Sequence, residues 1–280
     1  MSAGGVRRVI PLTLGWEELP ITISIHRSHG SDPNERLREP VPGVLCEVDG
    51  GWVLLDAGFN TPQLTDPTRA PGYVFDYVQD ELVGAAGDSV DVAFERVGID
   101  PDDVVALAVS HLHYDHAGGL HRFEGKVPVH CQKRELDAAL AGEEDAPGNR
   151  RVDYAGLDLD WRTADGDVEL APGITALATY GHTPGHQSFM VDLADGSGFV
   201  FAFDAADLQR NLDDELSPGG LFSEADDPEA EAIEAIRRLK KLSVEKGYRL
   251  LPGHDPDVWP AFTAELGVAA ADGPTRLLEW

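Results

Sequence analysis

Residues 110–119 read Ser110-His111-Leu112-His113-Tyr114-Asp115-His116-Ala117-Gly118-Gly119, which places three imidazoles and one carboxylate close together. The preceding run, residues 104–109, is apolar and predicts a buried strand that ends where this polar segment begins. Neutral imidazole and carboxylate are the usual nitrogen and oxygen ligands of zinc. In an extended loop, His111 and His113 face the same way. Asp115 and His116 are adjacent and point apart, so the segment can begin a second metal site as well.

Two later apolar runs also end in a residue of metal-ligand type. Residues 199–203 lead into Asp204, and residues 249–251 lead through a Pro-Gly pair into His254. A buried carboxylate at the end of an apolar strand is costly unless it is paired or binds a metal. Strands that alternate with loops and helices, and that carry such residues at their ends, predict an α/β layered domain with one active edge.

The loop at residues 181–188 contains two histidines within a Gly- and Pro-rich turn. It joins a predicted strand over residues 174–179 to another over residues 188–193. We expect His186, which lies close to the second strand, to be the metal ligand of this loop. For His182 we expect a structural or supporting role.

Two segments leave alternatives open. The hairpin of residues 44–55 ends in Asp56, which is either a simple turn former or an acceptor that orients a metal-bound histidine. The alternating aromatics Tyr73, Phe75 and Tyr77 are either a strand packed on the core or a lid over a pocket. Elsewhere the patterns predict strands over residues 6–14 and 21–26 and helices over residues 89–97 and 133–141.

Composition limits the classes of partner. The 280 residues contain 50 acidic and 22 basic side chains, a formal net charge of −28, which repels nucleic acid and anionic membranes. We expect neither as a partner. The two cysteines give no disulfide framework, and neither an apolar leader nor a bilayer-spanning segment is found, so we expect a cytoplasmic protein. With no linker-like or low-complexity tract, residues 1–280 are predicted to form a single domain.

The pattern His111-x-His113-x-Asp115-His116, followed by His186, Asp204 and His254, resembles the metallo-β-lactamase superfamily. The likeness runs from the strand end at residues 54–58 to Gly253-His254. The loop at residues 183–188 and the helix residues 236–240 are most similar to the N-acyl homoserine lactonase branch. The resemblance implies an α/β fold, an αββα sandwich in which two mixed β-sheets are flanked by helices.

The same resemblance implies two zinc ions per chain. The first ion would be held by His111, His113 and His186, the second by Asp115, His116 and His254, and Asp204 would bridge both. Two such ions carry four positive charges in total. The carboxylates of Asp115 and Asp204 and a bridging hydroxide neutralise three of them. The remaining charge lowers the pKa of bound water toward about 7 and polarises a carbonyl oxygen.

The activity implied is ring-opening hydrolysis of a lactone, either an N-acyl homoserine lactone, with quorum quenching as the role, or a related small lactone. The bridging hydroxide would attack the ester carbonyl, and the two zinc ions would stabilise the oxyanion and the leaving alkoxide. Asp115, a ligand with one free oxygen, is the candidate catalytic residue that passes a proton to that alkoxide. The alternatives are a thioester or phosphodiester hydrolase, a mononuclear iron dioxygenase, which would lack the second ligand set, and a catalytically silent metal-binding protein. A homodimer is left open.

The sequence departs from the lactonase branch beside the substrate. In that branch a tyrosine usually lies three residues after the bridging aspartate, and its phenol helps to bind the substrate carbonyl. Here Asp207 occupies that position. A carboxylate repels an oxyanion, so either Asp207 points away, or the substrate carries a cationic or hydrogen-bond-donating group. Tyr114 and Tyr180 are the candidates for supplying the missing phenol, and Asp207 and Tyr114 are the predicted substrate contacts.

Overall fold

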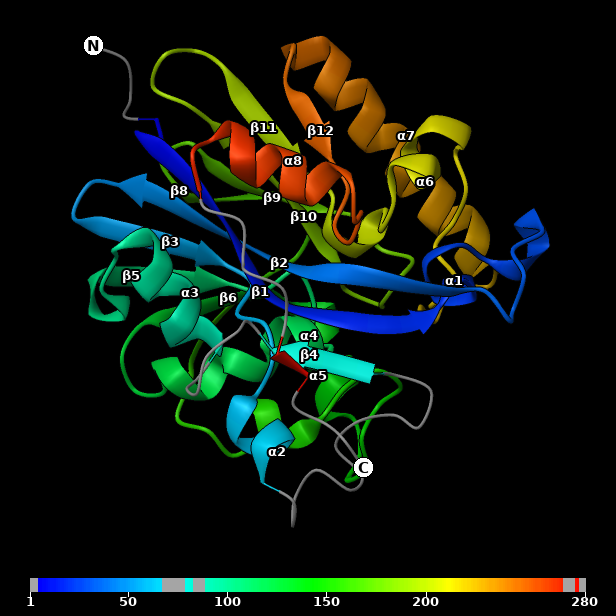
Figure 1. Cartoon of the computed structure of the whole chain (residues 1–280), viewed down its shortest axis with the longest axis horizontal. Coiled ribbons are helices and arrows are strands. Elements are labelled where there is room, and N and C mark those ends of the chain that lie inside the picture. The colour runs from blue at the N-terminus through cyan, green and yellow to red at the C-terminus, as the bar shows by residue number, and fades with distance from the viewer. Residues whose placement is uncertain (1–4, 67–78, 83–88, 269–274, 277–280) are drawn as a thin grey trace.

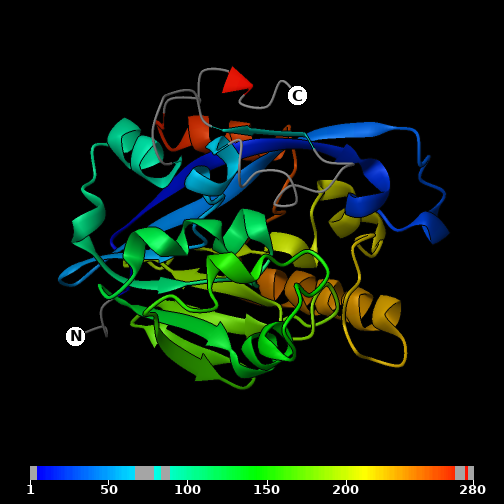
Figure 2. The ribbon, with the colours of Figure 1, turned by 90° about the horizontal axis from the view of Figure 1, so that it is seen from below.

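A computed structural model describes residues 5–66, 79–82, 89–268 and 275–276, and shows two β-sheets packed face to face with helices on their outer sides (Figures 1 and 2). Within these residues, the larger sheet has eight strands in the order β13-β4-β1-β2-β3-β5-β6-β7, and the smaller has five in the order β12-β11-β10-β9-β8. Both sheets combine parallel and antiparallel neighbours. The predicted sandwich of two mixed sheets flanked by helices is confirmed. The aromatic pattern at residues 73–77 lies outside the described residues.

The strands of the larger sheet are β1 (Arg8–Pro20), β2 (Arg36–Val48), β3 (Gly51–Leu55), β4 (Gln79–Leu82), β5 (Val104–Ala108), β6 (Pro128–Gln132), β7 (Asp160–Ala164) and β13 (Thr275–Arg276). Those of the smaller sheet are β8 (Val168–Ala171), β9 (Ile174–Ala178), β10 (Gln187–Asp192), β11 (Gly198–Phe201) and β12 (Arg249–Leu251). The helices are α1 (Ile21–Ser24), α2 (Thr61–Thr65), α3 (Ser89–Val97), α4 (Tyr114–Ala117), α5 (Lys133–Leu140), α6 (Gln209–Asp214), α7 (Pro228–Lys246) and α8 (Val258–Glu265). Short 3₁₀ helices span Arg27–His29, Pro101–Asp103, Gly118–Phe123, Arg151–Asp153 and Phe203–Ala205.

Three apolar cores separate the layers. Because successive side chains of a strand point to opposite faces, one strand can serve two cores. In β3, Trp52 and Leu54 belong to the core beneath the outer helices, whereas Val53 and Leu55 belong to the core between the sheets. The third core packs strands of the smaller sheet against Ile236 and Leu239 of α7. These cores fix the two sheets relative to each other and bring several strand ends to one edge.

One local prediction near the N-terminus is wrong. Residues 21–26 were expected as a strand, but Ile21–Ser24 form one helical turn, in which the amide of Ile25 donates to the carbonyl of Ile21. Short apolar runs do not distinguish a strand from a turn of helix by periodicity. The segment before residue 42 is also more regular than its polar composition suggests, because β2 already begins at Arg36 and pairs with the end of β1.

Candidate metal centre

The histidine-rich segment begins where β5 ends. The backbone is extended at His113, and α4 then places Asp115 and His116 on a single helical turn. Gly118 and Gly119 let this turn lie against the loop that follows β3. A Cβ atom on Gly118 would come within 2.3 Å of the Asn60 nitrogen, and one on Gly119 within 2.2 Å of the Ala57 oxygen. The paired glycines therefore permit a close backbone approach that holds the segment at the sheet edge.

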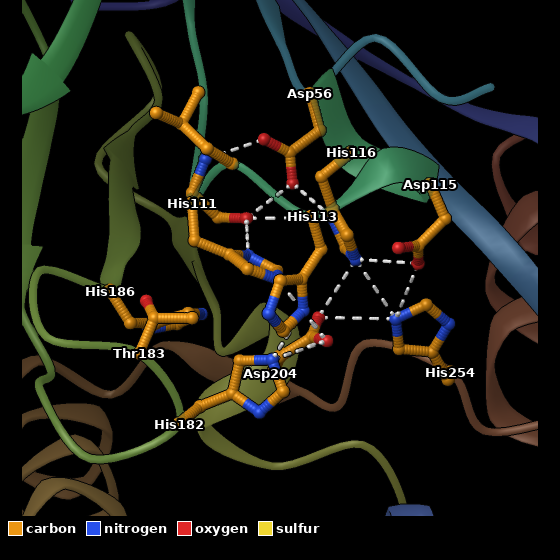
Figure 3. A network of polar contacts seen from close by, with 12 residues as sticks. Asp56, His111, His113, Asp115, His116, His182, Thr183, His186, Asp204 and His254 are labelled. Atoms are coloured by element: carbon orange, nitrogen blue, oxygen red, sulfur yellow. Dashed lines mark hydrogen bonds and ion pairs between the residues drawn. The ribbon is translucent and has the colours of Figure 1, made fainter. Parts of the chain in front are cut away.

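Four buried side chains form the first donor set: His111, His113, His182 and Asp204 (Figure 3). His182 Nε2 lies 3.0 Å from His113 Nδ1 and 3.3 Å from Asp204 Oδ2. His111 Nε2 lies 3.7 Å from the same aspartate oxygen, and it is buried with no hydrogen-bond partner among the described residues. Three imidazole nitrogens and one carboxylate oxygen thus converge on one point.

Asp115, His116 and His254 form the second donor set together with the other oxygen of Asp204 (Figure 3). His116 Nε2 lies 2.9 Å from Asp115 Oδ2, and His254 Nε2 lies 3.2 Å from His116 Nε2. Both nitrogens lie 3.1 Å from Asp204 Oδ1. Asp204 therefore presents one oxygen to each set, as the predicted bridging role requires.

The spacing of these atoms fits tetrahedral metal coordination. Zinc with nitrogen and oxygen ligands at about 2.0–2.2 Å requires neighbouring donor atoms about 3.4 Å apart. His116 Nε2 and Asp115 Oδ2 lie 2.9 Å apart, and His254 Nε2 and Asp115 Oδ2 lie 3.9 Å apart, which brackets this value. The residues present therefore fit two divalent ions.

The loop between β9 and β10 corrects one predicted ligand. His182, not His186, enters the first donor set, and among the described residues His186 belongs to neither set. His186 instead directs Nδ1 at Thr179, with Oγ1 at 2.9 Å and the backbone oxygen at 3.2 Å. The physical reason is the turn between them. Gly185 packs so tightly on α5 that an added Cβ would lie 2.2 Å from the Glu135 nitrogen, which holds the loop with His182 over the site.

Hydrogen bonds to His116 and His254 determine which ring nitrogen of each histidine is free to bind a metal. Asp56 Oδ2 lies 2.7 Å from His116 Nδ1, and Ser110 Oγ donates to the same carboxylate oxygen. The carbonyl of Pro40 lies 2.9 Å from His254 Nδ1. Because carboxylates and carbonyls only accept, each Nδ1 carries the proton and each Nε2 keeps a lone pair for a metal. Of the two interpretations left open for Asp56, the structure supports the acceptor that orients a histidine.

Glu135 is a supporting residue that no sequence pattern predicts. It is buried at the start of α5, and its Oε1 accepts from the amide of Leu112, between the first two histidines. Its Oε2 accepts from the Thr183 hydroxyl at 2.7 Å and from the Gly185 amide at 2.9 Å. One carboxylate thus ties together the two loops that supply the histidines of the first donor set.

The protonation of the two sets differs. Burial lowers the pKa of His113 to about 4 and that of His182 to about 3, so both are neutral at neutral pH and able to bind a metal. Burial acts in the same direction on His116, but the carboxylates of Asp115 and Asp204 outweigh it and raise its pKa. The second set therefore attracts positive charge, which a bound metal ion would supply in place of a proton.

A pocket of about 520 Å³, which includes space open to solvent, lies over both donor sets. Ligands of both sets line it together with Leu19, Ile23, Phe222 and three further acids, Glu17, Glu39 and Asp207. Asp207 therefore faces the pocket and does not point away. No lysine or arginine belongs to the pocket lining that the structure describes.

Neither candidate tyrosine replaces the missing phenol directly. Tyr114 lines the pocket, but its hydroxyl donates to Glu17 Oε2 at 2.7 Å. The Tyr180 hydroxyl donates to Gln132 Oε1 and accepts from the Gly166 amide, away from the pocket lining. Asp207 occupies the sequence position of that tyrosine and lines the pocket. Its carboxyl group is therefore the best candidate to take the place of the phenol.

Comparison with known proteins gives the family. Residues 38–254 match the Metallo-beta-lactamase superfamily. The chain belongs to this superfamily. An N-acyl homoserine lactonase from Bacillus thuringiensis is 32% identical over 228 residues, which cover 80% of this chain and 84% of that protein. The N-acyl homoserine lactonase AttM of Azorhizobium caulinodans is 31% identical over 247 residues, 86% of this chain and 89% of that one.

Solved structures agree with the superfamily assignment. The crystal structure of a quorum-quenching N-acyl homoserine lactone hydrolase aligns with a TM-score of 0.76 at 26% identity, over 91% of this chain and 95% of that chain. The predicted likeness to the lactonase branch is confirmed, and so is the prediction of a metal-dependent hydrolase. Among the described residues, no helix is long and apolar enough to cross a membrane.

Proposed function

We propose that this chain is a dinuclear zinc lactonase that opens an N-acyl homoserine lactone or a related small lactone. The observation that carries the proposal is the pair of complete donor sets that share Asp204 beneath one pocket. The relatives named as N-acyl homoserine lactonases support the choice of a lactone as substrate. We also propose that residues 1–280 form one domain, because the three cores share strands.

When bound, two zinc ions would supply a hydroxide nucleophile at neutral pH and polarise the ester carbonyl. His111, His113 and His182 would hold the first ion, Asp115, His116 and His254 the second, and Asp204 both. The net reaction adds water across the acyl C–O bond, breaks that bond, and yields a carboxylate and an alcohol with release of one proton. Asp115 presents Oδ2 to the second donor set and also lines the pocket, so Oδ1 can hold the proton that the ring oxygen takes up.

The pocket and the second donor set argue against the alternatives. Substrates with phosphodiester groups or anionic thiol carriers need cationic partners, and the described lining contains neither lysine nor arginine. A mononuclear iron dioxygenase needs only one ligand set, whereas the second set here is complete and buried. A catalytically silent metal-binding protein would not need a pocket over the metal centre.

The test combines metal analysis with a substrate panel. Elemental analysis of the purified protein should give close to two equivalents of zinc or a substituting divalent ion per chain. A panel of lactones, thioesters and phosphodiesters should show hydrolysis of lactones, lost on chelation and restored by zinc. Hydrolysis of another class with no lactone opened, or one equivalent of iron with oxygen consumption, would overturn the proposal.

A further inference from the structure

The pocket holds a carboxylate that the metal sites do not use. Asp207 is only 3% exposed, and its Oδ1 has no hydrogen-bond partner among the described residues. Its backbone oxygen accepts from the His254 amide at 2.8 Å, which fixes its position beside the second donor set. A buried acceptor without a partner costs free energy unless a bound molecule supplies a donor.

A second acid lies on the same pocket wall. Glu39 of β2 is 2% exposed, accepts from the Ser24 hydroxyl through Oε2, and lines the pocket with Asp207. Its Oε1 lies 3.7 Å from His254 Nδ1, which instead donates to the Pro40 carbonyl at 2.9 Å. Because His254 Nδ1 carries that proton and Nε2 faces the second donor set, Glu39 does not form a third metal site with it.

The charges around the pocket determine which substrates can bind beside Asp207 and Glu39. With two divalent ions bound, Asp115, Asp204 and a hydroxide would leave one positive charge at the centre. Burial and nearby carboxylates raise the pKa of Asp207, and burial raises that of Glu39 to about 7, so a bound molecule has to supply the cationic group that keeps these two acids ionised. An anionic substrate would find no lysine or arginine on the described lining. A neutral acyl amide donates through its single N–H, whereas a protonated amine both donates and complements the charge.

We propose that Asp207, backed by Glu39, forms a cation-recognition subsite, so that the lactones opened best carry a protonated amine. This inference rests on the proposed lactonase function, and it gives that function a substrate class. The amine would donate to Asp207 Oδ1 while the ester carbonyl lies over the metal centre. Glu17 also lines the pocket, but its Oε2 already accepts a hydrogen bond from the Tyr114 hydroxyl.

The probe is a pair of isosteric lactones. One γ-butyrolactone carries a dimethylaminomethyl group on the carbon next to the ring oxygen, and the other carries an isobutyl group there. The tertiary amine is protonated at neutral pH and cannot close to a lactam. The wild-type enzyme should prefer the amine in kcat/KM by roughly ten- to a hundredfold, the range of a hydrogen bond to a charged group. Asp207→Asn should reduce this preference below about threefold, and Glu39→Gln should reduce it less.

Controls separate the subsite from folding and net charge. Glu18 follows Glu17 in β1, lies outside the pocket lining and pairs with Arg36. Glu18→Gln therefore removes one negative charge near the pocket, and this variant should keep the full preference for the amine lactone. Metal content and the thermal midpoint of each variant verify the fold. Calorimetry with the ring-opened product pair gives a readout independent of turnover, and the amine product should bind wild type more tightly than Asp207→Asn by a similar factor.

The outcomes distinguish the two proposals. Equal rates for both isosteres in the wild type, or a preference that Asp207→Asn retains, would overturn the subsite and leave the lactonase function standing. A preference for the isobutyl lactone that disappears in Asp207→Asn would also overturn it, because Asp207 would then act as a neutral donor. If no lactone is opened, the proposed function fails, and the calorimetric comparison still decides whether Asp207 binds the amine.

Discussion

The choice between His182 and His186 is the sharpest test of the metal centre. His182 Nε2 lies 3.0 Å from His113 Nδ1 and 3.3 Å from Asp204 Oδ2, so His182→Ala removes one of four donors. Removing a group that only supports a ligand lowers metal affinity about 10–100-fold. Removing a direct donor should therefore cost more than about 100-fold at the first site, or more than about 2.7 kcal/mol.

His186→Ala is the matched comparison, because the two histidines share one loop. His186 is fully buried and directs Nδ1 at Thr179, and it belongs to neither donor set among the described residues. Its truncation should leave both metal affinities within about threefold of wild type. It should lower the free energy of unfolding by about 2–4 kcal/mol, because a packed ring and its hydrogen bond are lost.

The assay needs both measurements on both variants. Protein stripped with a chelator is titrated with zinc against a chromophoric competitor, and urea unfolding of the stripped protein gives stability without metal. His182→Ala should bind one zinc tightly and one weakly. If His186→Ala loses the first ion while His182→Ala keeps two, the tetrahedral interpretation of the donor spacing is refuted, and the ligand predicted from sequence is restored.

Three further predictions concern acids around the centre. Asp204→Asn should weaken both metals together, since an amide does not bridge two cations as a carboxylate does; loss of one metal alone in a zinc titration would show that Asp204 is not the bridge. Glu135→Gln should lower first-site affinity about 10–100-fold and second-site affinity less, because Glu135 ties the Leu112 amide, between His111 and His113, to the loop of His182, whereas Asp115 and His116 lie further along in α4; equal weakening of both sites would argue against this role. Asp207→Tyr should raise kcat/KM on neutral N-acyl homoserine lactones about tenfold by adding a donor near the developing oxyanion. Rates within about a factor of two of wild type would place Asp207 outside the reacting region.

Much of the site could be predicted because its ligands follow apolar strands. The run before His111 became β5, and residues 249–251 before His254 became β12 with the expected bounds. In both cases an apolar segment ends abruptly in a polar ligand, and burial of the strand leaves that ligand little freedom of position. Asp204 follows the same rule, with one addition. Phe203 adopts a left-handed conformation at φ 48°, which turns the chain into the site at a cost in strain.

The ligand of the third loop could not be chosen by such reasoning. His182 and His186 lie four residues apart on either side of a Gly- and Pro-containing turn, and both are ligand types. Which ring faces the metals depends on how the turn docks on α5, through Glu135 and the close contact at Gly185. The sequence around position 135 does not predict the contact between Glu135 and Gly185, because the two residues lie 50 positions apart.

The two donor sets also show why the fold and the metal centre form together. In each set, some donors follow β5 of the larger sheet, and the others follow strands of the smaller sheet. An ion bound to either set therefore links the two sheets across their shared core, and its binding free energy adds to the stability of the sandwich. Without metal, the same residues must bury two ligand carboxylates, which pair with His116 and His254 at 2.9–3.9 Å. Ser110 donates a hydrogen bond to Asp56, and Pro40 and Glu135 accept hydrogen bonds from His254 and from the Leu112 amide. These bonds hold the ligands in place in either state, so the site is organised before the ion arrives.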